Sequence, residues 1–311
     1  MSPAICLIHS PPTFIQHTLH QTQTISHRIT LQLRCICPLH PCTANRIRFC
    51  QALTHLMLNH NKPSLLQTMI PKLDVEGEPP EYTSGMGDSS PFSEKAIRRA
   101  FIRKVYITLA IQLTITVGII CMFIFWETLK EWVQDTPYFA YALLPAVLIL
   151  IMVLLCCENA RRKVPFNFIL LGIFTIVEGC MLGAISALYD VDAVMWAGGA
   201  TVVVTLGLTL FALQSKWDFT IMSGGLCCAL LVLLCFGMLC AILRSFWLNI
   251  VYACIGTFIF GMYLVVDTQL ILGGKHRYSV SPEEYIFAAL NIYLDIVNLF
   301  LLLLQLFGLC R

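Results

Sequence analysis

Long runs of apolar residues dominate the chain from about residue 105 onward, and only short polar segments separate them. Seven runs lack Lys and Arg and reach the roughly 20 residues that a helix needs to cross a bilayer. They are Val105–Trp126, Tyr138–Cys157, Phe166–Leu188, Ala193–Leu213, Ile221–Leu243, Phe246–Leu272 and Tyr285–Leu309. None alternates apolar and polar residues as the strands of a membrane barrel do. The pattern predicts an all-α polytopic membrane protein.

The overall composition agrees with this prediction. Hydrophobic residues make up 58% of the chain and charged residues 12%, with a mean hydropathy of +0.76. Soluble domains carry about 25% charged residues, so the composition excludes an ordinary soluble enzyme and a disordered protein. The later basic residues lie between the apolar runs and not along one face. We therefore expect the lipid bilayer as surroundings and no nucleic-acid partner.

The chain divides into three parts. Residues 1–73 contain no Asp or Glu and no sustained helical period, which indicates either a disordered tail or sequence upstream of the natural start, with Met69 as a candidate start. The run Cys35–Cys42 matches no familiar zinc spacing, so we expect no metal site and no cofactor. Residues 74–104 form a linker rich in Pro, Gly and acidic residues, followed by a basic juxtamembrane segment. Residues 105–311 form the membrane domain.

The linker contains a short candidate docking motif. Pro79, Pro80 and Tyr82 belong to a PPxY pattern. Such a segment adopts the polyproline II conformation, which the aromatic groove of a WW domain binds. We expect a partner with a WW domain, such as a ubiquitin ligase; a chance occurrence of four residues is the alternative.

The distribution of Lys and Arg predicts the orientation. Eleven lie in the segment before the first span and in alternate loops, against three on the other side. Because basic residues accumulate on the cytosolic side, we expect a cytosolic N-terminus. The opposite loops are acidic, through Glu127, Glu131, Asp135, Asp190 and Asp192. Seven crossings would place the C-terminus across the membrane, whereas a re-entrant last segment would return it to the cytosol.

Three acidic residues lie inside the predicted spans: Glu178, Asp267 and Asp295. A charged side chain at mid-helix costs about 2.5–3.5 kcal/mol on insertion scales, so such residues are functional candidates. The spans contain no Lys or Arg to neutralise them, so each must be protonated, paired with another acid or exposed to water. Glu178 either lines a cavity shared with the aspartates or bonds as a neutral acid to a neighbouring helix.

The last span has one polar face. Its members occur at helical spacing and are Asn291, Asp295, Asn298 and Gln305. In lipid this face must point into the protein. Just before the span, Ser281, Pro282 and Glu284 have the residue types of a helix N-cap, first turn and capping box, which predicts a helix starting at Ser281.

The two aspartates of the last two spans can meet. Asp267 lies six residues, or roughly 9 Å, before the Gly that ends its span. Two carboxyls in a poorly solvated site cannot both ionise cheaply, so they would share one proton and tie the helices together. Loss of that proton would leave two like charges that repel each other and attract cations, which describes a pH-controlled gate. The alternative is a static pair that only orients the helices.

Several segments of the chain carry recognisable motifs: Phe92–Tyr106, Phe211–Thr220, Asp267–Leu270, Ser281–Ile286 and Leu290–Ile296. With these motifs the chain from about Ser93 to Leu309 resembles the transmembrane BAX inhibitor motif family, and within it the lifeguard proteins. The resemblance implies a seven-helix bundle in which the other helices wrap a central last helix. It places the family's proton-sensing di-aspartyl pair on Asp267 and Asp295, and Arg161 and Arg162 are the nearest candidates for its arginine latch.

The resemblance also implies a function. Members of the family act as Ca²⁺ leak channels of intracellular membranes, mainly the endoplasmic reticulum, Golgi and endolysosomes, and they suppress apoptosis in part by lowering stored calcium. We expect such a pH-gated leak channel here, in endomembranes or the plasma membrane, with Ca²⁺ and H⁺ as its ions. Ca²⁺ prefers about six to eight oxygen ligands, more than two or three carboxylates with Asn291 and Asn298 supply, so binding would be weak, as conduction requires.

Two other functional classes are alternatives to the channel: a non-conducting regulator and an intramembrane protease. A non-conducting anti-apoptotic regulator would act through protein partners, such as apoptosis regulators bound by the tail and loops. An intramembrane aspartyl protease would have a Gly-x-Gly-Asp motif, whereas Tyr293 and Leu294 precede Asp295 here. We therefore expect no enzymatic activity.

Overall fold

The computed structural model describes residues 91–136, 138–156, 164–243, 245–273 and 279–309. Outside these residues lie the predictions for residues 1–73, for the linker up to residue 90 with its PPxY motif, and for the latch candidates Arg161 and Arg162. The described residues from Ile97 onward belong to one compact unit.

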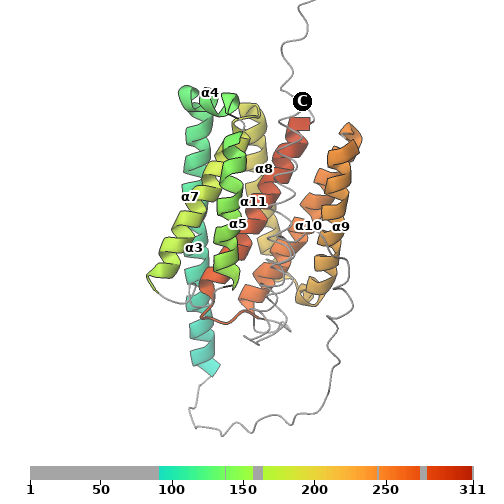
Figure 1. The fold of residues 1–311 in the computed structure, drawn as a ribbon. Helices are drawn as coiled ribbons and strands as arrows, with labels where there is room; N and C mark the ends of the chain where they lie inside the picture. The colour runs from blue at the N-terminus through green and yellow to red at the C-terminus, as the bar shows by residue number, and fades with distance from the viewer. Residues whose placement is uncertain (1–90, 137, 157–163, 244, 274–278, 310–311) are drawn as a thin grey trace, which may run out of the picture. The chain divides into compact units, whose positions relative to one another are not determined.

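Helices account for almost all of the described residues (Figure 1). They are α3 (Pro91–Phe125), α4 (Glu127–Asp135), α5 (Tyr138–Cys156), α7 (Phe166–Ser186), α8 (Val191–Gln214), the 3-10 helix η1 (Phe219–Met222), α9 (Ser223–Leu243), α10 (Phe246–Leu272) and α11 (Tyr285–Leu309). Their ends agree with the predicted spans to within a few residues, except that α3 begins 14 residues earlier and includes the basic juxtamembrane segment. The described part of the chain contains no strand, and an all-α polytopic membrane protein is confirmed.

The number of spans depends on one bend. Within the described residues, six helices are long and apolar enough to cross a membrane by themselves: α3, α7, α8, α10, α11, and η1 continued by α9. A seventh span forms if α4 and α5 are taken together, although the two helices meet at 88°. α4 is short and amphipathic and lies across the end of the bundle (Figure 1). Val133 is its one buried residue.

The last helix, α11, is the centre of the bundle. In its most apolar stretch 89% of the residues are buried inside the protein, against 17% for α8. From Ile286 to Gln305 every residue except Asn291 is buried. Helices α10, α8 and α7 pack against it. A central last helix, which the family resemblance implies, is therefore present in the structure.

The predicted start of this helix is wrong by four residues. Ser281 and Glu284 close a turn in which the Glu284 N–H donates to the Ser281 carbonyl at 3.0 Å, and the helix begins at Tyr285. The reason is a tertiary contact: the Val280 N–H donates to the Leu270 carbonyl of α10 at 3.1 Å. This bond fixes the chain to α10 just before Ser281, so the turn is needed to redirect it into α11.

Two glycines of α7 leave room for side chains of α3. A Cβ atom at Gly179 would lie 2.8 Å from the Ile119 side chain, and one at Gly183 would lie 2.7 Å from the Phe123 ring. Small residues four apart are a common device for close packing of membrane helices. The contact is specific to these positions, because a Cβ at Gly172 on the same helix would meet nothing within 4 Å.

We expect Gly183→Ala and Gly172→Ala to change stability in opposite directions. At Gly172 the new methyl group only improves helix propensity, so the free energy of unfolding should rise by up to about 1 kcal/mol. At Gly183 the methyl group must displace the buried Phe123 ring, and overpacking of this kind costs about 1–3 kcal/mol. Denaturant unfolding of both variants in micelles measures the difference, and equal shifts of the same sign would refute the packing argument.

Candidate functional site

The two aspartates predicted to form the gate lie on helices that pack against each other. Asp267 belongs to the last turns of α10 and its side chain is 9% exposed, while Asp295 lies near the middle of α11 and is 0% exposed. Both carboxyls therefore point into the protein and not toward lipid. Neither α10 nor α11 contains another Asp or Glu.

The contact between α10 and α11 shows which faces these residues occupy. A Cβ at Gly256 of α10 would lie 3.0 Å from the Leu302 side chain of α11. On α11, Leu302 follows Asp295 by seven residues, so these two side chains share one face of that helix. On α10, Asp267 follows Gly256 by eleven residues, so these two positions also share one face of their helix. Asp267 and Asp295 therefore lie on the two faces that these helices turn toward each other.

The same contact gives the register of this antiparallel helix pair (Figure 1). Counting eleven residues in opposite directions from Gly256 and Leu302 places Asp267 level with Asn291. Asp295 is one turn further along α11, an axial offset of about 6 Å. Asn291 thus lies level with Asp267 and one turn before Asp295 on the polar face of α11. The same face continues after Asp295 with the buried Asn298.

Glu178 belongs to a different polar group. Its side chain on α7 is 3% exposed and interacts electrostatically with Tyr293 of α11. The Tyr293 hydroxyl forms a 2.9 Å hydrogen bond with Thr116 of α3. Because Tyr293 and Asp295 are two residues apart, about 200° around the helix, they face opposite sides of α11. Glu178 therefore lies on the side of α11 opposite the aspartates.

Further side chains extend the polar group around Glu178. Gln112 of α3 donates from Nε2 to Oγ1 of Thr175 at 3.2 Å, and both residues are buried. The Glu178 Oε2 atom is buried without a hydrogen-bond partner. Sequence reasoning identified Glu178, whereas it interpreted the spacing of Gln112 and Thr116 only as a packing seam and did not predict their hydrogen bonds.

The last turn of α10, directly after Asp267, is held from several sides. The Gln269 side chain accepts a hydrogen bond from the Phe219 N–H at 2.8 Å and donates one to the Trp217 carbonyl at 3.0 Å. Arg98 of α3 donates to the carbonyl oxygen of Leu270 at 2.8 Å. Sequence reasoning counted Arg98 only as a cytosolic charge, because nothing in its neighbourhood along the chain indicates a contact with α10.

The described residues do not form a metal centre. No group of three or more His, Cys, Asp or Glu side chains comes together within this part of the chain. The α10–α11 face supplies two carboxylates and the amides of Asn291 and Asn298. Such a set can hold a proton or bind a cation weakly.

Comparison with known proteins identifies relatives of the whole helical part. The family model described as "Inhibitor of apoptosis-promoting Bax1" matches residues 98–311. Protein lifeguard 3 of Homo sapiens is 38% identical over 237 residues, covering 75% of this chain and 76% of the relative. Protein lifeguard 3 of Mus musculus is 39% identical over 221 residues, covering 70% and 71%. A Golgi anti-apoptotic protein of Vaccinia virus (strain Lister) is 35% identical over 220 residues, covering 71% and 90%.

The hydrogen bond between Tyr293 and Thr116 should stabilise the junction of α3 with α11. We expect Tyr293→Phe and Thr116→Val each to lower the free energy of unfolding by about 1 kcal/mol, as for other side-chain bonds between membrane helices. The double variant should lose little more than either single one. Unfolding of the four proteins in micelles measures this coupling, and strictly additive losses would mean that the bond contributes nothing.

Proposed function

Since the chain belongs to the family of inhibitors of apoptosis-promoting Bax1, as a lifeguard-like member, we propose that it is an anti-apoptotic membrane protein that leaks Ca²⁺ from intracellular stores. The name of the viral relative, Golgi anti-apoptotic protein, supports both the anti-apoptotic role and a location in endomembranes. Lower stored calcium would leave less to be released during a death signal. No enzymatic step is part of this proposal.

The observation that carries the proposal is the pair of buried aspartates on facing helices. Asp267 and Asp295 lie on the contact faces of α10 and α11, and neither helix contains a Lys, Arg or His. Two negative charges in this setting would be costly, because nothing on either helix neutralises them. A shared proton removes one charge and supplies a hydrogen bond between the carboxyls, which holds the helices together.

Loss of the shared proton would open the path. The two carboxylates then repel each other across the α10–α11 contact, and a cation can take the place of the proton. Asn291 and Asn298 continue the oxygen-bearing face along α11 and would line the route. Because this set is smaller than the six to eight oxygens that Ca²⁺ prefers, the ion binds weakly and can leave again.

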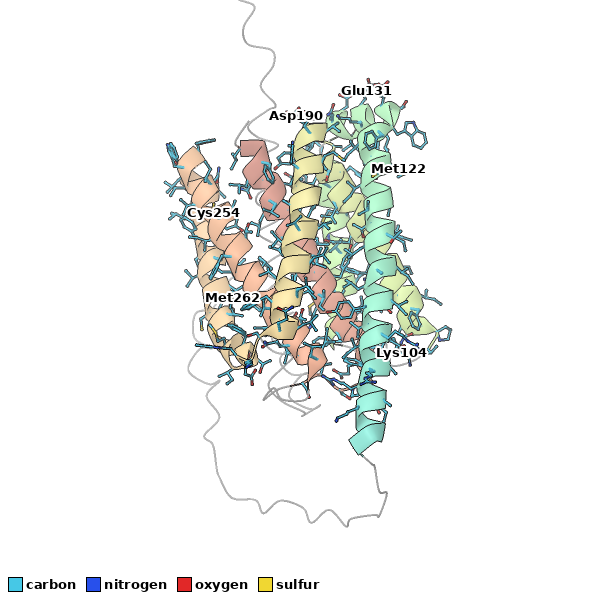
Figure 2. All side chains as sticks on the ribbon, turned by 180° about the vertical axis from the view of Figure 1, so that it is seen from behind. Lys104, Met122, Glu131, Asp190, Cys254 and Met262 are labelled. Carbon is cyan, nitrogen blue, oxygen red and sulfur yellow. The ribbon has the colours of Figure 1, made fainter. Side chains whose placement is uncertain are left out.

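The charges at the two ends of the bundle support a direction for the leak. Glu131 and Asp190 lie at one end and Lys104 lies toward the other (Figure 2). We place the basic end in the cytosol, since Lys and Arg accumulate on that side of membrane proteins. The acidic end then faces the lumen, where its charge would concentrate cations at the entrance.

The cytosolic tail would add a partner to this function. Pro79, Pro80 and Tyr82 would recruit a protein with a WW domain, such as a ubiquitin ligase, which would control how long the channel stays in the membrane. Glu178 takes no part in the proposed path, because it lies on the other side of α11 from the aspartates.

Reconstitution tests the gate directly. Purified protein in liposomes that contain a calcium-sensitive dye should pass Ca²⁺, with more flux as pH rises from 6 to 8 and the pair loses its proton. Asp267→Asn and Asp295→Asn should each flatten this pH dependence, since an amide cannot release the shared proton. Glu283→Gln, which changes an exposed acid outside the pair, is the matched control and should behave as the unaltered protein.

The outcomes separate the channel from a protein that acts only through partners. A pH-dependent flux that persists unchanged in both aspartate variants would falsify the gate. Absence of any flux at every pH, in protein that is folded and inserted, would favour the non-conducting regulator. Cell survival assays with the same variants would then show whether protection from apoptosis depends on the aspartates.

A further inference from the structure

The end of α10 presents an ordinary problem of helix termination. The last four carbonyl groups of a helix have no partner within the helix, and burial makes such groups costly. Gly273 ends α10 with a φ of 58°, a backbone conformation that favours glycine, and its N–H donates to the Gln269 carbonyl at 3.0 Å. The Leu270 carbonyl accepts the bond from the Val280 N–H at 3.1 Å and can take a second donor, whereas the Leu272 carbonyl still requires a donor from elsewhere.

Arg98 supplies these donors from α3. Its guanidinium donates to the carbonyl oxygens of Leu270 at 2.8 Å, Leu272 at 3.1 Å and Val280 at 2.7 Å. The same group stacks over the buried Phe101 ring at 5.1 Å from its centroid. One side chain thus joins α3 to the end of α10 and to the chain that leads into α11.

The fit around Arg98 leaves no spare room. A Cβ atom at Gly273 would collide with the guanidinium, so glycine is required here by space as well as by backbone conformation. A planar guanidinium presents several N–H groups in fixed directions, and its charge suits the negative end of a helix dipole. A lysine at this position would keep the charge but could not reach three carbonyls in the same way.

A second contact from α3 holds the start of α11. The Lys104 ammonium lies over the Tyr285 ring at 5.6 Å from its centroid. The Tyr285 hydroxyl also accepts a hydrogen bond from Asn167 Nδ2 of α7 at 3.1 Å. The N-terminal part of α3 therefore contacts the end of α10 through Arg98 and the start of α11 through Lys104.

We propose that Arg98 is a positioning residue, which fixes the last turn of α10, and with it Asp267, to the juxtamembrane segment of α3. Asp267 is three residues before Leu270, so the hydrogen-bonded carbonyl lies within one helical turn of the carboxyl. A shift of α3 is then transmitted to the position of Asp267 relative to α11. The effect on gating rests on the proposed function, whereas the effect on the end of α10 does not.

Hydrogen–deuterium exchange of the protein in nanodiscs tests the hold on α10. We expect Arg98→Ala to raise the exchange rates of backbone amides in residues 264–273 by about tenfold or more, since three charge-assisted hydrogen bonds are lost. Arg98→Lys should restore part of the protection. Arg99→Ala removes the same charge from an exposed neighbour and should leave these rates unchanged. Unchanged rates in folded Arg98→Ala would overturn the proposal.

A variant on the other side of the contact covers the case in which Arg98→Ala does not fold. Gly273→Ala leaves Arg98 in the chain but pushes its guanidinium away, so it should raise the exchange rates of residues 264–273 in the same manner. Normal protection in both Gly273→Ala and Arg98→Lys would again overturn the proposal.

The same variants, reconstituted for Ca²⁺ flux, separate this inference from the function on which it builds. If the unaltered protein leaks with pH dependence, Arg98→Ala should shift the pH of half-maximal flux, Arg98→Lys should shift it less, and Arg99→Ala should not shift it. Faster exchange without any shift would refute the link to Asp267. If no protein leaks at any pH, the proposed function fails, and exchange at residues 264–268, which include Asp267, still decides whether Arg98 positions it.

Discussion

Every polar group inside a bilayer has to find its partners within the protein, and in this chain that constraint falls mainly on α11. One face of the helix carries Asp295 and Asn298, and the opposite face carries the Tyr293 hydroxyl. With polar groups on two opposite faces, such a helix needs protein partners on at least two of its sides. Enclosure by the other helices is the arrangement that satisfies both faces, and the burial of α11 from end to end follows from it.

The end of α10 connects this helix packing with the proposed proton sharing, because it carries Asp267. Within one turn after Asp267, Gln269 binds the connection between α8 and η1, and Leu270 accepts a hydrogen bond from Arg98. The aspartate thus belongs to a turn whose position is set by segments far apart in the sequence. In the proposed gate, the Asp267 carboxyl has to come within hydrogen-bond distance of Asp295, which lies about one helical turn away along the helix pair, and this requires positioning of this kind.

The sequence was sufficient for features that depend on one segment at a time. Apolar length located the spans, and the helical spacing of Asn291, Asp295 and Asn298 identified the polar face of α11, on which Asp295 and Asn298 are buried. Features that depend on a distant partner were missed. The cap formed by Arg98 requires knowing that α3 passes the end of α10, and the helix start at Tyr285 requires the bond between Val280 and Leu270.

The helices also differ in length, and this has a consequence for the surrounding membrane. At 1.5 Å per residue α5, with 19 residues, extends about 28 Å, whereas α10, with 27 residues, extends about 40 Å. A hydrocarbon layer of about 30 Å matches the first and is too thin for the second. Lipids beside α5 and beside α10 therefore contact apolar helix surfaces of unequal length. Hydrophobic mismatch of this kind is relieved by tilting or by local deformation of the bilayer, so membrane thickness becomes a variable to which this bundle responds.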